Sequence, residues 1–465
     1  MKYISTRGEA DTLDFEGVTL TGLARDGGLY VPESLPQFSA DDIRSMRGKS
    51  YADVAFQVMQ PFVAGSVSDT ELKEMLDKTY GDAFRHPATA PMVQLGSNEW
   101  LLELFHGPTL AFKDFALQLL GRFFDHFTAK RQQKLTVLGA TSGDTGSAAI
   151  EGCRGRDNVS IFMLHPKGRV SDVQRKQMTT VLETNVVNIA IEGTFDDCQA
   201  LVKACFNDLA FRDKVGLTAV NSINWARVMA QIVYYFTSAV ALGSPERPIS
   251  YCVPTGNFGD IFAGYIAKGM GLPVEKLAIA TNSNDILART LATGRYASGT
   301  ATSTLSPSMD IQVSSNFERL LFDLAGRDGA HVRGYMDTFQ REVGFDLRAD
   351  HLAKLRAGFV ADRVNDAETS AAMKDYFERT GYVADPHTAV GLEAARRTLE
   401  AGPTPIITLS TAHPVKFGAA VEAACGITPQ LPAHMADLFD REERFEVLPN
   451  DKATLQKRVL QGGTA

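Results

Sequence analysis

Cysteine and tryptophan are scarce in this 465-residue chain, which contains five of the first and two of the second. The cysteines stand at 153, 198, 205, 252 and 425, and they form no CxxC pair and no Cys/His ligand spacing. We therefore expect reduced thiols and neither a disulfide framework nor a zinc or other metal site.

Long apolar runs and blocks of like charge are absent as well. No segment reaches the roughly 20 apolar residues of a membrane span, and the first nine residues lack the apolar core of a signal peptide. Acidic and basic residues are interspersed, with a net charge of -8, so no basic surface for nucleic acid is expected. We expect a cytoplasmic protein that binds neither membranes nor nucleic acid.

The N-terminal region, residues 1–90, differs in pattern from the rest. Four glycines interrupt alternating residues at 14–31, which predicts short strands joined by turns. Helices are predicted at 51–64 and 69–79, the second with Ser68 and Glu71 at the spacing of a capping box.

Continuous apolar strands alternate with helices in the remainder, at 134–138, 159–164, 186–191, 249–253 and 406–409. Such strands predict parallel sheets covered by helices on both faces. The glycine turns fall into two groups, so we expect an α/β fold of two parallel-sheet domains plus an N-terminal α+β region. The predicted larger domain comprises 91–128 and 221–465, and the smaller comprises 129–220.

A single lysine stands among phenylalanines where a helix is predicted to begin, in Phe112-Lys113-Asp114-Phe115. Burial and the positive end of the helix dipole both oppose its charge. A lysine driven toward its neutral amine is a nucleophile that can form a Schiff base with an aldehyde cofactor. The alternative is a structural lysine with its stem on apolar surface and its ammonium in water.

Three turns between strands and helices carry further candidate residues. Gly256-Asn257-Phe258-Gly259-Asp260 presents backbone N–H groups suited to a phosphate dianion. Thr141-Ser142-Gly143-Asp144-Thr145-Gly146 is rich in hydroxyls that can hold a carboxylate or cap a helix. Thr411 follows a buried strand, where its hydroxyl can face a ring nitrogen or cap a helix. Neither glycine turn fits GxGxxG or a P-loop, which disfavours a dinucleotide site.

Other segments complete an ordered pattern. They are Tyr3-Ile4-Ser5-Thr6-Arg7-Gly8, His106-Gly107-Pro108-Thr109, Asn221-Ser222-Ile223-Asn224-Trp225-Ala226-Arg227, Pro307-Ser308-Met309-Asp310-Ile311 and Asp385-Pro386-His387-Thr388-Ala389. With the lysine and the glycine turns, this order resembles the fold-type II (tryptophan synthase β-like) pyridoxal-phosphate enzymes. The closer resemblance is to the threonine synthase family in its longer bacterial and fungal form, over nearly the whole chain.

The resemblance implies pyridoxal 5'-phosphate as the cofactor, held by Lys113 as an internal aldimine. It implies a phosphate cup formed by Gly256, Asn257, Phe258, Gly259 and Asp260, with Thr411 facing the pyridine nitrogen. Asp144 matches a position near the phenolic oxygen where related enzymes often carry asparagine, so its carboxylate requires protonation or a compensating charge. Thr141, Ser142 and Thr145 match the loop that grips the substrate carboxylate.

The implied reaction converts O-phospho-L-homoserine and water to L-threonine and phosphate, the last step of threonine biosynthesis, in a carbon–oxygen lyase acting on phosphates. Lys113 is then the base that serves several substrate carbons. The substrate phosphate needs a second anion site, for which Lys167, Arg175, Asn224 and Arg227 are the candidates. Residues 167–177 fit a solvated helix face equally well. His387 and His413 are interpreted as structural, and a monomer is expected from the longer family form.

The residues alone leave three alternative functions open. A dehydratase or β-replacement enzyme would keep the cofactor and release ammonia from threonine or exchange a β-substituent. A nucleotide-binding oxidoreductase would bind NAD or FAD at the glycine turns. A non-catalytic binding protein would keep the fold without a covalently held cofactor.

Overall fold

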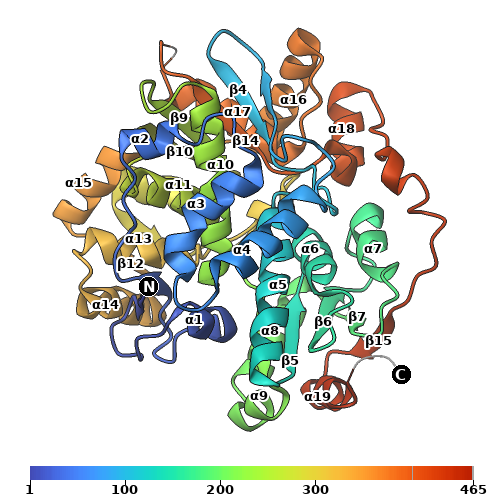
Figure 1. Cartoon of the computed structure of the whole chain (residues 1–465). Coiled ribbons are helices and arrows are strands. Elements are labelled where there is room, and N and C mark those ends of the chain that lie inside the picture. Colours follow the sequence, from blue (N-terminus) through green and yellow to red (C-terminus); the bar gives the residue numbers. More distant parts are fainter. Residues whose placement is uncertain (401, 463–465) are drawn as a thin grey trace.

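Two β-sheets flanked by helices organise the computed structural model, which describes residues 1–400 and 402–462 (Figure 1). Within these residues the larger sheet has the strand order β13-β10-β9-β14-β4-β3. Its strands are β3 (Met92–Gln94), β4 (Glu99–Glu103), β9 (Ile249–Pro254), β10 (Val274–Thr281), β13 (Phe359–Arg363) and β14 (Ile406–Ser410). Every pair is parallel except β3 with β4.

The smaller sheet has the order β15-β7-β6-β5-β8, and all its pairs are parallel. Its strands are β5 (Leu135–Ala140), β6 (Val159–Pro166), β7 (Val186–Glu192), β8 (Leu217–Thr218) and β15 (Glu446–Pro449). The central strands of both sheets are buried along their length because helices cover both faces, as their continuous apolar sequences require. The predicted pair of parallel-sheet α/β units is confirmed.

The N-terminal region forms an α+β layer, as predicted. Strands β1 (Tyr3–Ser5) and β2 (Tyr30–Pro32) pair antiparallel, and the helices are α1 (Phe15–Thr21), α2 (Ala40–Arg44), α3 (Tyr51–Val63) and α4 (Asp69–Leu76), followed by a π-helical turn at Asp77–Gly81. The capping box of Ser68 and Glu71 is present. Residues 14–31 are not a series of short strands, because Asp14 accepts a hydrogen bond from the N–H of Gly17 and thereby starts α1.

Helices pack around the smaller sheet and along the boundary between the sheets. They are α5 (Lys113–Arg131), α6 (Asp144–Cys153), α7 (Asp172–Thr179), α8 (Phe195–Phe206), α9 (Leu209–Val215) and α10 (Trp225–Ala241). Almost every residue of α10 is buried, and its Trp225 contacts Tyr3 and Phe62 of the N-terminal layer. The N-terminal layer and the larger sheet thus share one core.

The remaining helices surround the larger sheet. They are α11 (Gly259–Gly269), α12 (Ile286–Thr293), α13 (Phe317–Leu324), α14 (Gly329–Glu342), α15 (Ala349–Gly358), α16 (Asp366–Thr380), α17 (Pro386–Thr398) and α18 (Gly418–Cys425), with 3-10 turns at Pro307–Met309, Pro414–Phe417 and Ala433–Met435. A two-stranded ribbon of β11 (Arg295–Ala297) and β12 (Gly344–Asp346) lies apart from both sheets.

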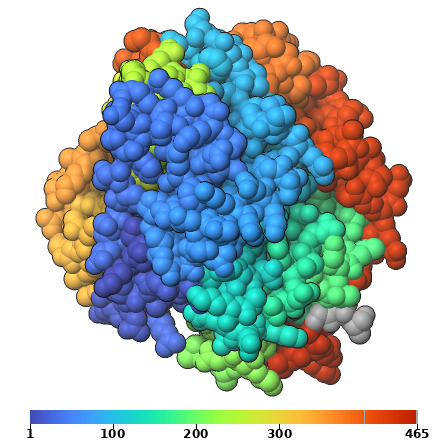
Figure 2. Space-filling view, viewed as in Figure 1, coloured from blue at the N-terminus to red at the C-terminus, as the bar shows by residue number. Residues whose placement is uncertain are grey.

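The C-terminal segment departs from the predicted domain division. After α18 the chain runs down one edge of the molecule to β15 and α19 (Lys452–Leu460), and the space-filling view shows these residues on the edge away from the N-terminal layer (Figures 1 and 2). Strand β15 pairs with β7, so this part of 221–465 belongs to the smaller sheet. A local pattern indicates a strand but does not indicate which sheet it joins.

Candidate active site

Lys113 is the first residue of α5, and its side chain is buried. Its Nζ lies 3.5 Å from the Oδ2 of Asp144 and 3.3 Å from the Oγ of Ser308. Burial lowers the pKa of Lys113, the attraction of Asp144 opposes that shift, and the charges of Lys416 and Arg227 lower the pKa further. The pKa of this amine is therefore lowered, as the sequence predicted, and a lower pKa favours the neutral form that can act as a nucleophile.

The turn before α5 is held by the neighbouring carboxylate. Asp114 accepts hydrogen bonds from the N–H and the hydroxyl of Thr109, at 2.8 and 2.7 Å, and burial raises its pKa to about 7. A side chain at Gly107 would collide with Asp114 at 2.5 Å. The His-Gly-Pro-Thr segment is thus a turn that delivers Lys113 to the start of its helix.

Asp144 begins α6 and faces two lysines. Besides Lys113, the Nζ of Lys416 lies 2.9 Å from its Oδ1, and the Nε2 of Gln174 donates to the same oxygen at 2.7 Å. Although burial raises the pKa of Asp144, the charges of Lys416 and Lys113 outweigh it and hold that pKa well below its usual range. The compensating charge that the sequence required is supplied by Lys416.

Close packing of two helices brings Lys113 and Asp144 together. A Cβ at Gly121 of α5 would stand 1.9 Å from the carbonyl oxygen of Gly152, and one at Gly152 of α6 would stand 2.3 Å from that of Leu117. Only glycine allows the backbones to approach so closely. The contact sets the relative position of the two helices.

The turn of residues 141–146 leaves backbone donors free. The hydroxyl of Thr141 accepts from the N–H groups of Gly143 and Gly146, at 2.9 and 2.8 Å, so this hydroxyl shapes the turn. Gly143 has a φ of +144°, and a Cβ there would collide with Gln174 at 2.4 Å. Among the described residues none accepts from the N–H groups of Ser142, Asp144 or Thr145. These donors suit an anion such as a carboxylate.

The second glycine turn, at the start of α11, also leaves backbone N–H groups without an acceptor among the described residues. Phe258 takes a left-handed conformation with φ of +63° and caps the helix without a side-chain bond. The described part of the chain offers no acceptor to the N–H groups of residues 256–261. A Cβ at Gly256 would stand 2.9 Å from the carbonyl oxygen of Ser308, so glycine is needed for the close approach of that loop.

Asp260 lies in the first turn of α11 and is buried. Its Oδ1 accepts from the hydroxyls of Tyr234 and Tyr235, at 2.6 and 3.1 Å, and its Oδ2 has no partner in the described structure. Burial raises the pKa of Asp260 to about 7, and both tyrosine hydrogen bonds oppose the shift. The raised pKa favours the neutral carboxyl, which repels an anion at this helix end less than a carboxylate does.

Thr411 is linked through the backbone to the start of α5. Its carbonyl oxygen accepts from the N–H of Phe112 at 2.9 Å, and Ala412 forms a bridge with Ala111. The residue predicted to face the pyridine nitrogen therefore neighbours the residue before Lys113.

The four candidates for a substrate-phosphate site separate in space. Arg227 is buried, its Nη1 donates to the carbonyl oxygen of Val220 at 3.0 Å, and its Nε has no partner among the described atoms. Burial lowers its pKa to about 10, and its charge acts on Lys113. Asn224 caps α10 with its amide oxygen and donates from its amide nitrogen to the carbonyl oxygen of Thr19, so it has a structural role.

The other two candidates are paired with carboxylates. Lys167 is exposed and lies 3.5 Å from Glu192, and Arg175 contacts Glu443 and Asp172. Neither contacts the cluster around Lys113 within the part of the chain that the structure describes. Arg227 is therefore the candidate that the fold brings to the reactive lysine.

Sequence reasoning missed Lys416, Gln174 and Ser308. Lys416 stands between Val415 and Phe417 just after the Thr411 strand end, and the lysine-among-apolar-residues signal used for Lys113 would have found it. Gln174 lies in the charged block 167–177 and Ser308 in the segment 307–311, but nothing in either segment shows that these two side chains meet Asp144.

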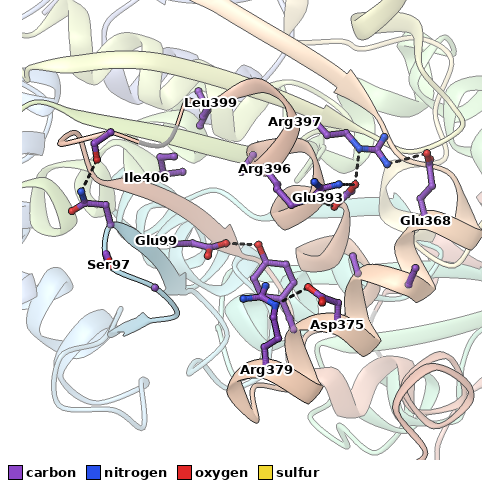
Figure 3. Close-up of a pocket in the computed structure, with 17 residues that line it drawn as sticks. Ser97, Glu99, Glu368, Asp375, Arg379, Glu393, Arg396, Arg397, Leu399 and Ile406 are labelled. Atoms are coloured by element: carbon purple, nitrogen blue, oxygen red, sulfur yellow. Dashed lines mark hydrogen bonds and ion pairs between the residues drawn. The ribbon is translucent and has the colours of Figure 1, made fainter.

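A surface hollow lies elsewhere on the molecule. It has a volume of about 880 Å³, lies between α16, α17 and the loop before β4, and contains none of the predicted site residues (Figure 3). Figure 3 shows its charged groups paired with one another, with Arg379 on Asp375, and Arg396 and Arg397 on Glu393. This hollow holds no reactive amine.

Three further observations concern the described residues only. None of their helices is long and apolar enough to cross a membrane. No group of histidine, cysteine and acidic side chains among them is arranged to hold a metal ion, and their five cysteines are unpaired.

Comparison with known families and sequences gives one consistent result. Residues 2–80 match the model of the threonine synthase N terminus, residues 85–339 that of pyridoxal-phosphate dependent enzymes, and residues 388–459 that of the threonine synthase C-terminal part. Threonine synthase from Pseudomonas aeruginosa is 57% identical, over 100% of this chain and 99% of that protein. Threonine synthase from Schizosaccharomyces pombe is 45% identical, over 99% and 98%.

Solved structures agree with the sequence comparisons. The crystal structure of PLP-bound threonine synthase from Brucella melitensis superposes with a TM-score of 0.97 at 54% identity, over the whole of both chains. Threonine synthase from yeast superposes with a TM-score of 0.93 at 40% identity, covering 99% of this chain and 98% of the other. This chain belongs to the threonine synthase family of pyridoxal-phosphate-dependent enzymes.

Proposed function

We propose that this protein converts O-phospho-L-homoserine and water to L-threonine and phosphate, as the last step of threonine biosynthesis. The observation that carries the proposal is a buried Lys113 amine facing Asp144, in a chain that matches threonine synthases along its whole length. The enzyme is a pyridoxal-phosphate-dependent carbon–oxygen lyase.

The residues present fit pyridoxal 5'-phosphate. Lys113 would hold it covalently, the free N–H groups of Gly256, Asn257, Phe258, Gly259 and Asp260 would hold its phosphate, and Thr411 would face its ring nitrogen. Asp144 would lie near its phenolic oxygen with Lys416 as counter-ion. When bound, the cofactor supplies an electron sink that spreads the charge left as a proton leaves a substrate carbon.

The side chains of the protein would divide the remaining tasks. The Nζ of Lys113 takes protons from the substrate Cα and Cβ as phosphate leaves Cγ, and it returns protons to Cγ and Cα, while water adds at Cβ. Its lowered pKa favours the neutral amine that this role needs. The free N–H groups of Ser142, Asp144 and Thr145 bind the substrate carboxylate, and Arg227 binds the substrate phosphate.

The first experiment separates this reaction from its near alternatives. Purified protein loaded with pyridoxal phosphate is given O-phosphohomoserine, and both phosphate and threonine are measured. We expect equal amounts of the two products. Ammonia from threonine or serine, without phosphate from O-phosphohomoserine, would instead establish a dehydratase.

The second experiment tests Lys113 directly. Lys113→Ala is expected to lose the visible absorbance of the bound cofactor and nearly all threonine formation, whereas Lys203→Ala, at an exposed position of α8, should retain both. Borohydride reduction followed by peptide mapping should place the vitamin B6 adduct on residue 113. An adduct on another lysine would contradict the assignment.

The proposed function needs only a small-molecule substrate. We infer a cytoplasmic monomer without nucleic-acid partners, in keeping with five unpaired cysteines and a biosynthetic reaction. Light scattering during size-exclusion chromatography tests the monomer, for which a mass near 50.5 kDa is expected.

A further inference from the structure

A hydroxyl that the assignments above do not use lies against the reactive amine. The Oγ of Ser308 accepts a hydrogen bond from the Nζ of Lys113 at 3.3 Å and donates one to the Oδ2 of Asp144 at 3.3 Å. With the direct contact of 3.5 Å between Lys113 and Asp144, the three groups form a triangle. The hydroxyl of Ser308 therefore helps to orient the Lys113 amine, which the proposed reaction uses.

The loop that carries Ser308 is fixed from one side by a partly buried polar cluster. Asp310 accepts from the side-chain amides of Asn282 and Asn284, at 2.8 and 3.0 Å, and from the N–H and hydroxyl of Thr304, at 3.0 and 2.6 Å. Asn282 and Asn284 follow β10 at the end of the larger sheet and are buried. Asp310 thus ties this loop to the end of β10, two residues after Ser308.

A histidine fixes the same loop from the other side. The backbone N–H of Ser308 donates to the Nε2 of His387 at 3.2 Å, and the Nδ1 of His387 lies 2.6 Å from the Oδ2 of Asp385. Because Nε2 accepts, the proton of the neutral ring is on Nδ1 and is donated to Asp385. Both side chains are buried, so this arrangement is shielded from water.

The capping of α17 does not by itself account for this pair. Asp385 caps the helix by accepting from the N–H groups of His387 and Thr388, at 3.0 and 3.1 Å, and any residue other than proline at 387 has that N–H. The imidazole adds a contact to Ser308, on a loop 79 residues away in the chain. Its position is explained by the loop that it holds.

We propose that Ser308 is a further active-site residue, whose hydroxyl holds the Lys113 amine in place, and that His387 with Asp385 is the pair that positions Ser308. This rests on the proposed function, in which the same amine binds the cofactor and moves the substrate protons. Without the hydroxyl, the amine is still present but samples other orientations. Its reactions slow while substrate binding by other residues is retained.

The test compares Ser308→Ala with Ser303→Ala, which removes an exposed hydroxyl from the same loop. Ser308→Ala is expected to lower kcat about tenfold, the effect of losing one such hydrogen bond, with KM within about twofold of wild type. A second readout needs no turnover: the rate at which visible absorbance returns when pyridoxal phosphate is added to the cofactor-free chain. This rate should fall in Ser308→Ala and stay unchanged in Ser303→Ala.

Conservative variants separate positioning from a merely structural role. Ser308→Thr keeps the hydroxyl and should restore most of both rates. His387→Gln keeps an acceptor within reach of the Ser308 N–H and should stay within about threefold of wild-type kcat, whereas His387→Leu should resemble Ser308→Ala.

Two results would overturn the proposal. The first is a Ser308→Ala variant that matches Ser303→Ala in both readouts, and the second is equal loss in Ser308→Ala and Ser308→Thr. If wild type forms no threonine, the proposed function fails, but the absorbance rate still reports whether Ser308 positions Lys113.

Discussion

At the scale of single residues, the charge state of each buried group in the site depends on its partners. Lys113, Asp114, Asp144 and Asp260 are all buried, yet their pKa values move in different directions. Asp144 stays charged because Lys416 and Lys113 lie within ion-pair distance of it. Asp114 and Asp260 have no ion pair and accept hydrogen bonds from hydroxyl or N–H donors, so burial raises their pKa to about 7. The partners decide the charge.

The pairing of Asp144 with Lys416 predicts a stability cycle. Asp144→Asn should lower the free energy of unfolding of the cofactor-free chain by about 3 kcal/mol, because it leaves buried lysine charge unpaired. The double variant Asp144→Asn with Lys416→Met should be more stable than Asp144→Asn alone. Urea unfolding of wild type, Asp144→Asn, Lys416→Met and the double variant completes the cycle, and losses that simply add would contradict the pairing.

The same pair predicts a pH dependence. The folded-state pKa of Asp144 is depressed, so its stabilisation is present above the unfolded value of about 3.9 and is lost as pH falls below it. Wild type should therefore lose more stability than Asp144→Asn on acidification below about pH 4.

Asp260 predicts a pH dependence of cofactor affinity. Its pKa of about 7 makes the carboxyl mainly neutral at pH 6 and mainly charged at pH 8. A charged carboxylate repels the phosphate dianion at the start of α11, so wild-type affinity should fall over this range by more than that of Asp260→Asn. Absorbance titrations with pyridoxal phosphate test this, and parallel profiles would exclude the repulsion.

At the scale of secondary-structure elements, the α5–α6 contact carries the site. These helices begin with Lys113 and Asp144, and they touch at Gly121 and Gly152. Gly152→Ala should lower stability by about 2 kcal/mol, since the added methyl group meets backbone that cannot move aside, and it should also lower kcat.

A matched glycine provides the control for that substitution. Gly334 lies within α14, where a Cβ would meet no described atom within 4 Å, so Gly334→Ala should raise stability by about 0.5 kcal/mol. Thermal unfolding of both variants gives the comparison. A Gly152→Ala protein as stable as Gly334→Ala would show that the helices can separate without cost.

At the scale of the whole molecule, the C-terminal segment joins the two sheets. Glu443 contacts Arg175 and Lys176 of α7 and accepts from the hydroxyl of Thr179 at 2.7 Å. Because α7 also carries Gln174, which donates to Asp144, this segment supports the helix that completes the site. Strand β15 then extends the smaller sheet beside β7, and α19 packs its apolar residues into the core of that sheet.

Helix α19 offers a matched test of that support. Leu455 is fully buried against the smaller sheet, while Leu460 of the same helix is 47% exposed. Leu455→Ala should lower the free energy of unfolding by about 3 kcal/mol, and Leu460→Ala by less than about 0.5 kcal/mol. Guanidinium unfolding and limited proteolysis check this, and equal effects would mean that α19 does not stabilise the sheet.

Local sequence patterns predicted a large share of the fold. The strands at 159–164, 186–191 and 249–253 lie where they were expected, because a buried parallel strand is marked by its own apolar residues. The prediction for residues 14–31 was wrong because glycine spacing does not reveal that Asp14 caps a helix. The pairing of β15 was missed because strand partners are chosen over long distances in the chain.

The sequence by itself determined the α/β architecture, the lysine at the start of a helix and the two glycine turns, because each depends on neighbouring residues. The family resemblance followed from their order. Only the tertiary structure decided that Lys416 neutralises Asp144, that Arg227 rather than Lys167 or Arg175 lies near Lys113, and that Ser308 is held by His387. Those contacts join residues between 79 and 272 positions apart in the chain, and burial and charge act through space.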